Sequence, residues 1–167
     1  MGQQGLGRLF DLVAGVAPVD LAGGAVTGNR VHLKNCAGVT VVFFKEAGAA
    51  AEPVVLDVQE ADAATSGTIQ DLNVIDHYYL KSETTLDGDE TWSKVTQTEA
   101  SEITPAVSDT QQILAFYVDA TWLSDGFEWL SVNTADVTTA GQLGSVLYIL
   151  HDLTVQRKPE NLANPQA

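Results

Sequence analysis

GFEWLSVNTADVTTAGQLGSVLYIL, residues 126–150, holds two apolar runs that are separated by a polar linker. The runs at residues 127–132 and 145–150 have the length and the β-branched and aromatic content of strands. The second run is apolar at nearly every position, which is typical of a strand buried on both faces, in a sandwich core or at a subunit contact. The stretch therefore predicts a pair of core strands, and its linker contains no catalytic group.

From residue 29 onward the rest of the sequence alternates between apolar and polar residues with period two. Turn-forming residues separate the runs, which predict strands at residues 31–34, 39–45, 54–58, 72–80, 92–95 and 112–118. Together with the two later runs this makes about eight strands, with no sustained helix between them. The predicted fold class is all-β: an antiparallel β-sandwich or jelly-roll-like domain at residues 29–151.

The two ends of the chain differ from this domain. In residues 1–28, apolar side chains recur at three- and four-residue spacing up to Pro18, which predicts a short amphipathic helix. Two interpretations stay open: a helix packed on its own domain, or an arm that contacts a neighbouring subunit through Leu6, Leu9, Phe10 and Val13. Residues 152–167 lack periodicity and predict an extended C-terminal tail, free or laid along a neighbour.

The charge of the chain limits its partners. It has 167 residues, the length of one domain, and 22 Asp and Glu oppose 8 Lys and Arg, giving a formal net charge of -14. Nucleic acid binding needs clustered Lys and Arg, so we expect no nucleic acid partner. Acidic membrane surfaces would repel the chain, and no apolar window reaches the ~20 residues of a membrane span. The only cysteine, Cys36, is expected to be a buried, inert thiol.

The titratable residues do not form a recognisable catalytic motif. His32, His77 and His151 lack metal-binding spacing, and adjacent residues of a strand, such as Asp76 and His77, are expected to point to opposite faces and not to pair. Nearby carboxylates such as Asp57 and Glu60 are expected by chance in so acidic a chain. Since nucleophile elbows and phosphate-binding loops are also missing from the sequence, we expect no enzyme and no cofactor.

Two further groups of residues could bind ligands. Asp87, Asp89 and Glu90 form a carboxylate loop of the kind that Ca²⁺ prefers, although a solvated hairpin tip is the simpler interpretation because EF-hand spacing is missing. The aromatic residues could line a carbohydrate platform; they are Tyr78, Tyr79, Trp92, Trp122 and Trp129. Trp129 shares a strand face with Phe127, which favours a core position for it.

Residues 119–150 resemble a family of small virion proteins of tailed bacteriophages. The similar positions are an Asp-rich turn before Gly-Phe, an Ala-Asp pair and a Q-x-G-x-x-L-Y-x-L ending: Asp119, Asp125, Gly126, Phe127, Ala135, Asp136, Gln142, Gly144, Leu147, Tyr148 and Leu150. Residues 29–48, NRVHLKNCAGVTVVFFKEAG, are similar to the V-x-L-K-N strand of the same family and the apolar strand after it.

The resemblance implies a structural protein of the phage head, a capsid decoration (cement) protein. Its implied partner is the major capsid protein and its place the outer surface of the virion, after synthesis in the host cytoplasm. A closed homo-oligomer is expected on symmetry grounds, with a trimer favoured. Two alternatives stay open: another virion component (tail-tube, head-completion or baseplate protein), or a carbohydrate-binding or adhesion module.

Overall fold

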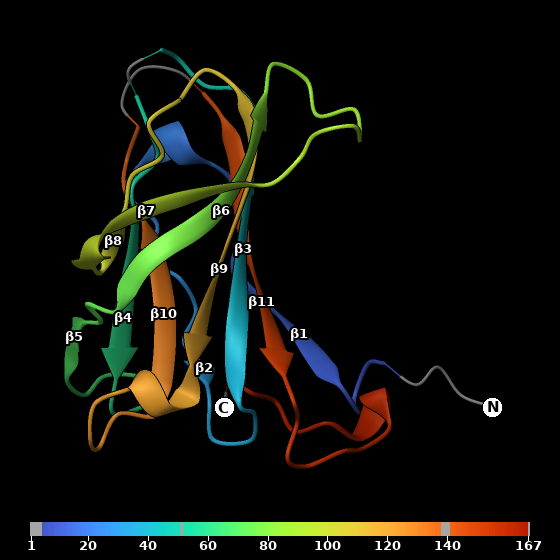
Figure 1. Cartoon of the computed structure of the whole chain (residues 1–167). Coiled ribbons are helices and arrows are strands. Elements are labelled where there is room, and N and C mark those ends of the chain that lie inside the picture. Colours follow the sequence, from blue (N-terminus) through green and yellow to red (C-terminus); the bar gives the residue numbers. More distant parts are fainter. Residues whose placement is uncertain (1–4, 51, 138–140, 167) are drawn as a thin grey trace.

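Two antiparallel β-sheets make up the fold in the computed structural model of the chain, which describes residues 5–50, 52–137 and 141–166 (Figure 1). The large sheet has six strands, in the order β1 (Phe10–Asp20), β11 (Leu143–His151), β3 (Gly38–Lys45), β9 (Gln111–Asp119), β6 (Ile75–Glu83) and β7 (Ser93–Ala100). The small sheet has the order β2 (Val31–His32), β10 (Trp129–Thr134), β4 (Leu56–Ala61) and β5 (Ile69–Asp71), and β8 (Glu102–Ile103) pairs with β4. Three short 3-10 turns are η1 (Leu21–Gly23), η2 (Ala120–Trp122) and η3 (Pro159–Asn161). The predicted all-β class is confirmed, and every strand predicted from the sequence overlaps one of these strands.

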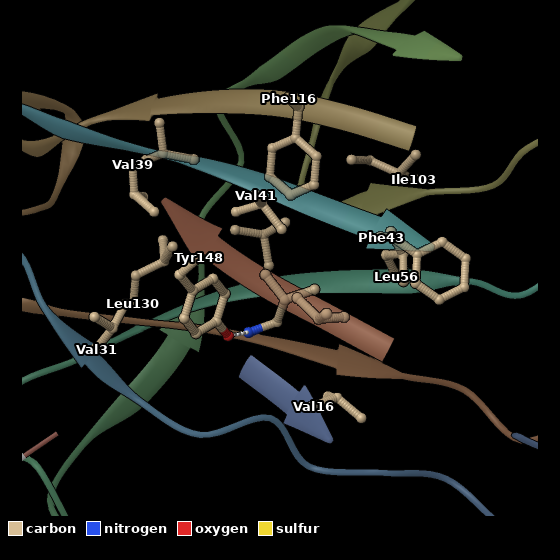
Figure 2. Packing of buried hydrophobic residues seen from close by; sticks show 14 of the residues in the cluster. Val16, Val31, Val39, Val41, Phe43, Leu56, Ile103, Phe116, Leu130 and Tyr148 are labelled. Carbon is tan, nitrogen blue, oxygen red and sulfur yellow. Dashed lines mark hydrogen bonds between the residues drawn. The ribbon is translucent and has the colours of Figure 1, made fainter. Parts of the chain in front are cut away.

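The hydrophobic core lies between the two sheets. Phe43 and Phe116 of the large sheet and Leu130 of the small sheet belong to one buried cluster (Figure 2). Tyr148 of β11 crosses the core: its hydroxyl accepts a hydrogen bond from the Val132 N–H at 2.9 Å and donates one to the Asn29 carbonyl at 3.1 Å. One side chain of the large sheet is thus hydrogen-bonded to the backbone of the small sheet.

The predicted strand pair at 127–132 and 145–150 is not a pair within one sheet. Its first member is β10 of the small sheet and its second is β11 of the large sheet. Burial on both faces was predicted for residues 145–150, which form β11, but it is found in β10 instead. In β11, buried residues alternate with exposed or half-buried ones, whereas β10 is buried at nearly every position. β11 is apolar on both sides because its outer side chains lie on an apolar surface of the molecule.

The predicted N-terminal helix is wrong, because residues 10–20 form the edge strand β1. Register shifts lie between Ala14 and Val16 and between Val16 and Val19, and each adds one residue to β1 relative to β11. Each added residue lengthens the usual spacing of two between core-facing side chains. Val13, Val16 and Val19 therefore face the core at intervals of three, which resembles the spacing of a helix.

The segment after β11 lies against its own domain. The Arg157 N–H donates to the Gly7 carbonyl at 2.9 Å, and the Pro165 carbonyl accepts from the His32 N–H at 2.8 Å. Close to the end, the Gln166 Nε2 donates to the Ala14 carbonyl at 3.0 Å. The described part of the predicted tail, residues 152–166, is thus hydrogen-bonded to Gly7, to Ala14 in β1 and to β2.

A buried lysine ends β3. Lys45 is only 2% exposed, and its Nζ donates to the carbonyls of Glu46, Ser108 and Thr110 at 2.9–3.0 Å. The ammonium thereby joins β3 to the loop that precedes β9. Burial lowers the pKa of Lys45 to about 8, since the charged form loses water.

Candidate interaction surface

The outer face of the large sheet carries rows of mostly apolar side chains that continue from strand to strand, with Thr40, Ser145 and Lys81 among them. The strand registers align three such rows: Leu12–Ile149–Thr40–Tyr117, Ala14–Leu147–Val42–Ala115–Tyr79 and Ser145–Phe44–Ile113–Lys81. We call these residues the apolar face. Successive side chains of a strand alternate between sheet faces, so the core takes the residues between them. The rows join β1, β11, β3, β9 and β6 into one surface.

Large side chains on the apolar face are open to solvent. Phe44 is 52% exposed and Leu12 47%, and Leu147 is 39% exposed. None of the residues in the three rows is acidic, although the whole chain carries 22 Asp and Glu. A contiguous exposed apolar area of this kind marks an interaction site more often than isolated surface residues do.

The outer face of the small sheet differs in chemistry. Asp57, Gln59 and Asn133 lie there, and the Asn133 Nδ2 donates to the Gln59 Oε1 at 2.8 Å. Burial and the neighbouring Asp71 carboxylate raise the pKa of Asp57. The molecule thus has one polar, acidic sheet face and one apolar sheet face.

The N-terminal residues predicted to contact a neighbour separate into two groups. Val13 is buried in the core of its own domain, so it is not available to a neighbour, and that part of the prediction needs correction. Leu9 is 60% exposed, while Leu6 and Phe10 are half-buried. A bridge between Leu6 and Phe10 forms a tight turn before β1. The contact of Leu6, Leu9 and Phe10 with a neighbour stays a prediction.

The sequence drew attention to two sets of carboxylates, the loop with Asp87, Asp89 and Glu90 and the nearby residues Asp57 and Glu60. Asp87, Asp89 and Glu90 do lie together, with ligand atoms within 4.8 Å of one another, but a Glu90 oxygen accepts the N–H groups of Asp87 and Gly88. Those backbone bonds lower the pKa of Glu90 and close the hairpin tip. Asp57 and Glu60 lie on opposite faces of β4, Asp57 half-buried on the outer face and Glu60 buried.

The buried Glu60 has a structural role. Its two oxygens accept from the Gln70 Nε2 at 2.6 Å and from the Ser124 N–H at 2.7 Å. A carboxylate that is 1% exposed needs such donors, because burying an unpaired charge is costly. The side chain therefore fastens the loop before β10 to β4 and β5.

One sequence argument about histidine is wrong. The His77 Nδ1 and the Asp76 Oδ1 lie 2.5 Å apart, although the two residues are adjacent in β6. Ile75 and Tyr78 are both buried, so the alternation of faces breaks between them, and Asp76 and His77 line the same depression. The hydrogen bond from His77 lowers the pKa of Asp76.

The predicted aromatic platform divides between core and surface. Tyr78 is buried in the core, and Trp129 is buried as expected, stacked on His32 with ring centroids 4.3 Å apart. Trp92 lies under the Lys81 ammonium, whose Nζ is 5.3 Å from the ring centroid. Tyr79 and Trp122 instead line a shared depression at one end of the large sheet.

This depression, which we call the aromatic hollow, is lined by Tyr79, Tyr117, Trp122, His77 and Asp76, with Ala115 beside Tyr79. It has a volume of about 280 Å³. The sequence analysis named Tyr79 and Trp122 but missed Tyr117. In the predicted strand at 112–118, Tyr117 lies between Phe116 and Val118, and strand alternation would have placed it on the outer face if those two face the core.

Comparison with known protein families, curated proteins and solved structures finds no match to this chain. Within residues 5–50, 52–137 and 141–166, none of the helices has the length and apolar character needed to cross a membrane.

Proposed function

We propose that this chain is a structural protein of a tailed-bacteriophage virion that decorates and stabilises the capsid by binding across capsomers of the major capsid protein. The observation that carries the proposal is the apolar face: Phe44, Leu12 and Leu147 are exposed on a surface without acidic residues, in a chain of net charge -14. The choice of the major capsid protein as the partner rests on the resemblance of residues 119–150 to small virion proteins.

The strand order supports a jelly roll, a fold that viral capsid domains use. When β6, β7 and β8 are set aside, the large sheet reads β1-β11-β3-β9 and the small sheet reads β2-β10-β4-β5. The chain then crosses between sheets at every connection except β4 to β5, as in a jelly roll. The β6–β7 hairpin is an insertion between β5 and β9 that widens the large sheet (Figure 1). Because one fold serves many functions, this order supports the proposal without deciding it.

The surface chemistry fits a protein that coats a shell. Burying exposed side chains such as Phe44 or Leu12 against a neighbour removes apolar surface from water, at roughly 25 cal/mol for each Å². The three rows contain no carboxylate that would need desolvation on binding, although Asp76 lies beside Tyr79 and Tyr117 in the aromatic hollow. The acidic remainder of the molecule would repel packaged DNA, which suits the outer surface of a capsid.

The proposal is tested by cryo-electron microscopy of virions of the encoding phage and by rebinding of the purified protein to undecorated shells. We expect density for the domain on the capsid exterior, in hundreds of copies, with the apolar face against a capsid protein or against a second copy. A handful of copies would instead indicate a connector or baseplate component. Virions without density on the exterior would contradict the proposal.

A matched pair of variants separates the apolar face from general surface hydrophobicity. Phe44→Asp puts a charge on the apolar face, and Ile69→Asp puts the same charge on β5 of the small sheet, at 52% and 47% exposure. Both variants should fold, because both side chains are largely in solvent. We expect Phe44→Asp to lose shell binding by at least roughly tenfold and Ile69→Asp to retain it. Equal loss in both would rule out the apolar face as the binding surface.

A further inference from the structure

We propose that the aromatic hollow is a binding site for an organic ammonium ion, of the quaternary or methylated kind. The site lies where β6 and β9 separate, and its walls are Tyr79, Tyr117 and Trp122. Tyr79 and Tyr117 also belong to the apolar face, so the site is open on the free protein, and its test there does not rest on the proposed capsid binding. Three observations carry the inference: how the hollow forms, how its rings are fixed, and which charges surround it.

The hollow exists because two neighbouring strands diverge. The register of β6 with β9 runs from Tyr79↔Ala115 to Glu83↔Gln111, while Ile75 to Leu80 of β6 pair with β7. Figure 1 shows β6 turning away from β9 at this end. Ala115 lies in the row between Val42 and Tyr79, so a small side chain stands beside large ones. The depression therefore follows from backbone geometry as well as from side-chain size.

Two rings meet at nearly a right angle on one side of the hollow. The centroids of Tyr117 and Trp122 are 6.2 Å apart, with 78° between the ring planes. This is an edge-to-face arrangement, which fixes the two rings against each other. A cation held in the hollow within ~6 Å of a ring centroid would be attracted to that aromatic face. Tyr79 supplies a third ring from β6.

The ring positions are set by the surrounding chain. Trp122 ends η2, whose first turn is held by the Asp119 Oδ1, which accepts from the Thr121 N–H at 2.9 Å and from its hydroxyl at 2.8 Å. Tyr117 lies across Gly38, where a Cβ would approach the Tyr117 hydroxyl to 2.2 Å. Only glycine leaves this space for the ring. A hollow whose walls are fixed in advance loses little entropy when a ligand binds.

The charges around the hollow favour a cation. Asp76 lines it, and an adjoining depression of about 480 Å³ shares Asp76, His77 and Trp122 with it and adds Glu99. Neither lining contains Lys or Arg, but Lys94 of β7 pairs with Tyr79 and acts on the Asp76 carboxylate, so it offsets part of the acidic charge. Asp76 and His77 are hydrogen-bonded to each other, so His77 partly offsets one carboxylate and leaves Glu99 at the rim. A methylated ammonium is weakly hydrated and matches aromatic faces beside carboxylates better than a neutral ligand does.

The test is a titration of ¹⁵N-labelled protein with choline chloride, followed by NMR at constant ionic strength. We expect the Trp122 indole N–H resonance to shift and saturate while those of Trp92 and Trp129 stay. Choline should bind roughly 5- to 30-fold more tightly than 3,3-dimethylbutan-1-ol, its uncharged analogue of the same shape. Equal affinity for the two compounds would overturn the proposal, because the charge would then contribute nothing.

Two variants and two further ligands complete the design. Trp122→Ala should abolish binding, while Trp92→Ala, at similar exposure but beside Lys81, should retain it. Unchanged binding by Trp122→Ala would also overturn the proposal. Saturable binding of an N-acetylated trimethyl-lysine amide would support it, and tighter binding than choline would indicate a modified protein side chain as the source. Binding of methyl glycosides without choline binding would identify a sugar site instead and contradict the inference.

Discussion

The hydroxyl of Tyr148 makes a strong prediction about stability. In Tyr148→Phe the ring stays in the core, but the Val132 N–H loses its acceptor and the Asn29 carbonyl loses a donor, at 2.9 and 3.1 Å. A buried amide without a partner costs about 1–3 kcal/mol, and the second bond contributes about 0.5–1.5 kcal/mol. We therefore expect the free energy of unfolding to fall by about 2–4 kcal/mol.

The assay is urea denaturation at 25 °C, followed by tryptophan fluorescence and far-ultraviolet circular dichroism, with Tyr79→Phe as control. Tyr79 is 42% exposed, so removal of its hydroxyl should change stability by less than about 0.5 kcal/mol. The slope of free energy against urea should stay the same in both variants. A Tyr148→Phe midpoint equal to that of the wild type would refute the idea that this hydroxyl joins the sheets.

Three other outcomes are expected. Trp129→Ala should lower the free energy of unfolding by about 3–5 kcal/mol in the same assay, because the ring is 7% exposed and stacked on His32. The control Trp92→Ala should leave the free energy of unfolding nearly unchanged, because Trp92 is 49% exposed. Burial raises the pKa of Cys36 to about 11, so a thiol reagent at pH 8 should react roughly a hundredfold more slowly with the folded than with the urea-unfolded protein, and equal rates would show an accessible thiol. The pKa of Lys45 is about 8 in the folded protein and about 10.4 in the unfolded chain, so the unfolded chain binds the proton more tightly. Between pH 8 and about 10.4 the free energy of unfolding of the wild type should therefore rise by about 1–3 kcal/mol relative to that of Lys45→Met. A difference between the two proteins that does not change with pH would contradict this.

The sequence predicted strands well where the alternation of side chains was regular. Strands such as β3 and β9 were predicted almost to the residue, since Val39 to Lys45 and Gln112 to Val118 combine period two with β-branched and aromatic residues. β1 was not recognised, because two added residues changed its period from two to three. β5 was also missed, because its three residues lie in a polar segment and are all exposed, so no alternation of buried and exposed side chains marks the strand.

The surfaces were less predictable than the strands. The apolar character of Leu147 and Ile149 was read as two-sided burial, because a sequence does not tell a covered face from an exposed one. The aromatic hollow depends on where β6 leaves β9: their pairing ends at Tyr79, and the residues of β6 before it pair with β7. Its three rings come from two strands and a turn, so only the sheet order brings them together.

The edge of β1 has a consequence for how the protein behaves when it is concentrated. The Ala14 carbonyl accepts from the Asn29 Nδ2 and the Gln166 Nε2, and the Gly15 carbonyl accepts from the Asn29 N–H at 2.7 Å. These donors occupy positions that a strand of another copy would need. Endless edge-to-edge stacking requires two open edges on every copy, and here one of them is blocked by the chain itself. Strand addition at this part of β1 is therefore disfavoured, while the exposed side chains of the apolar face stay available for contact with a partner.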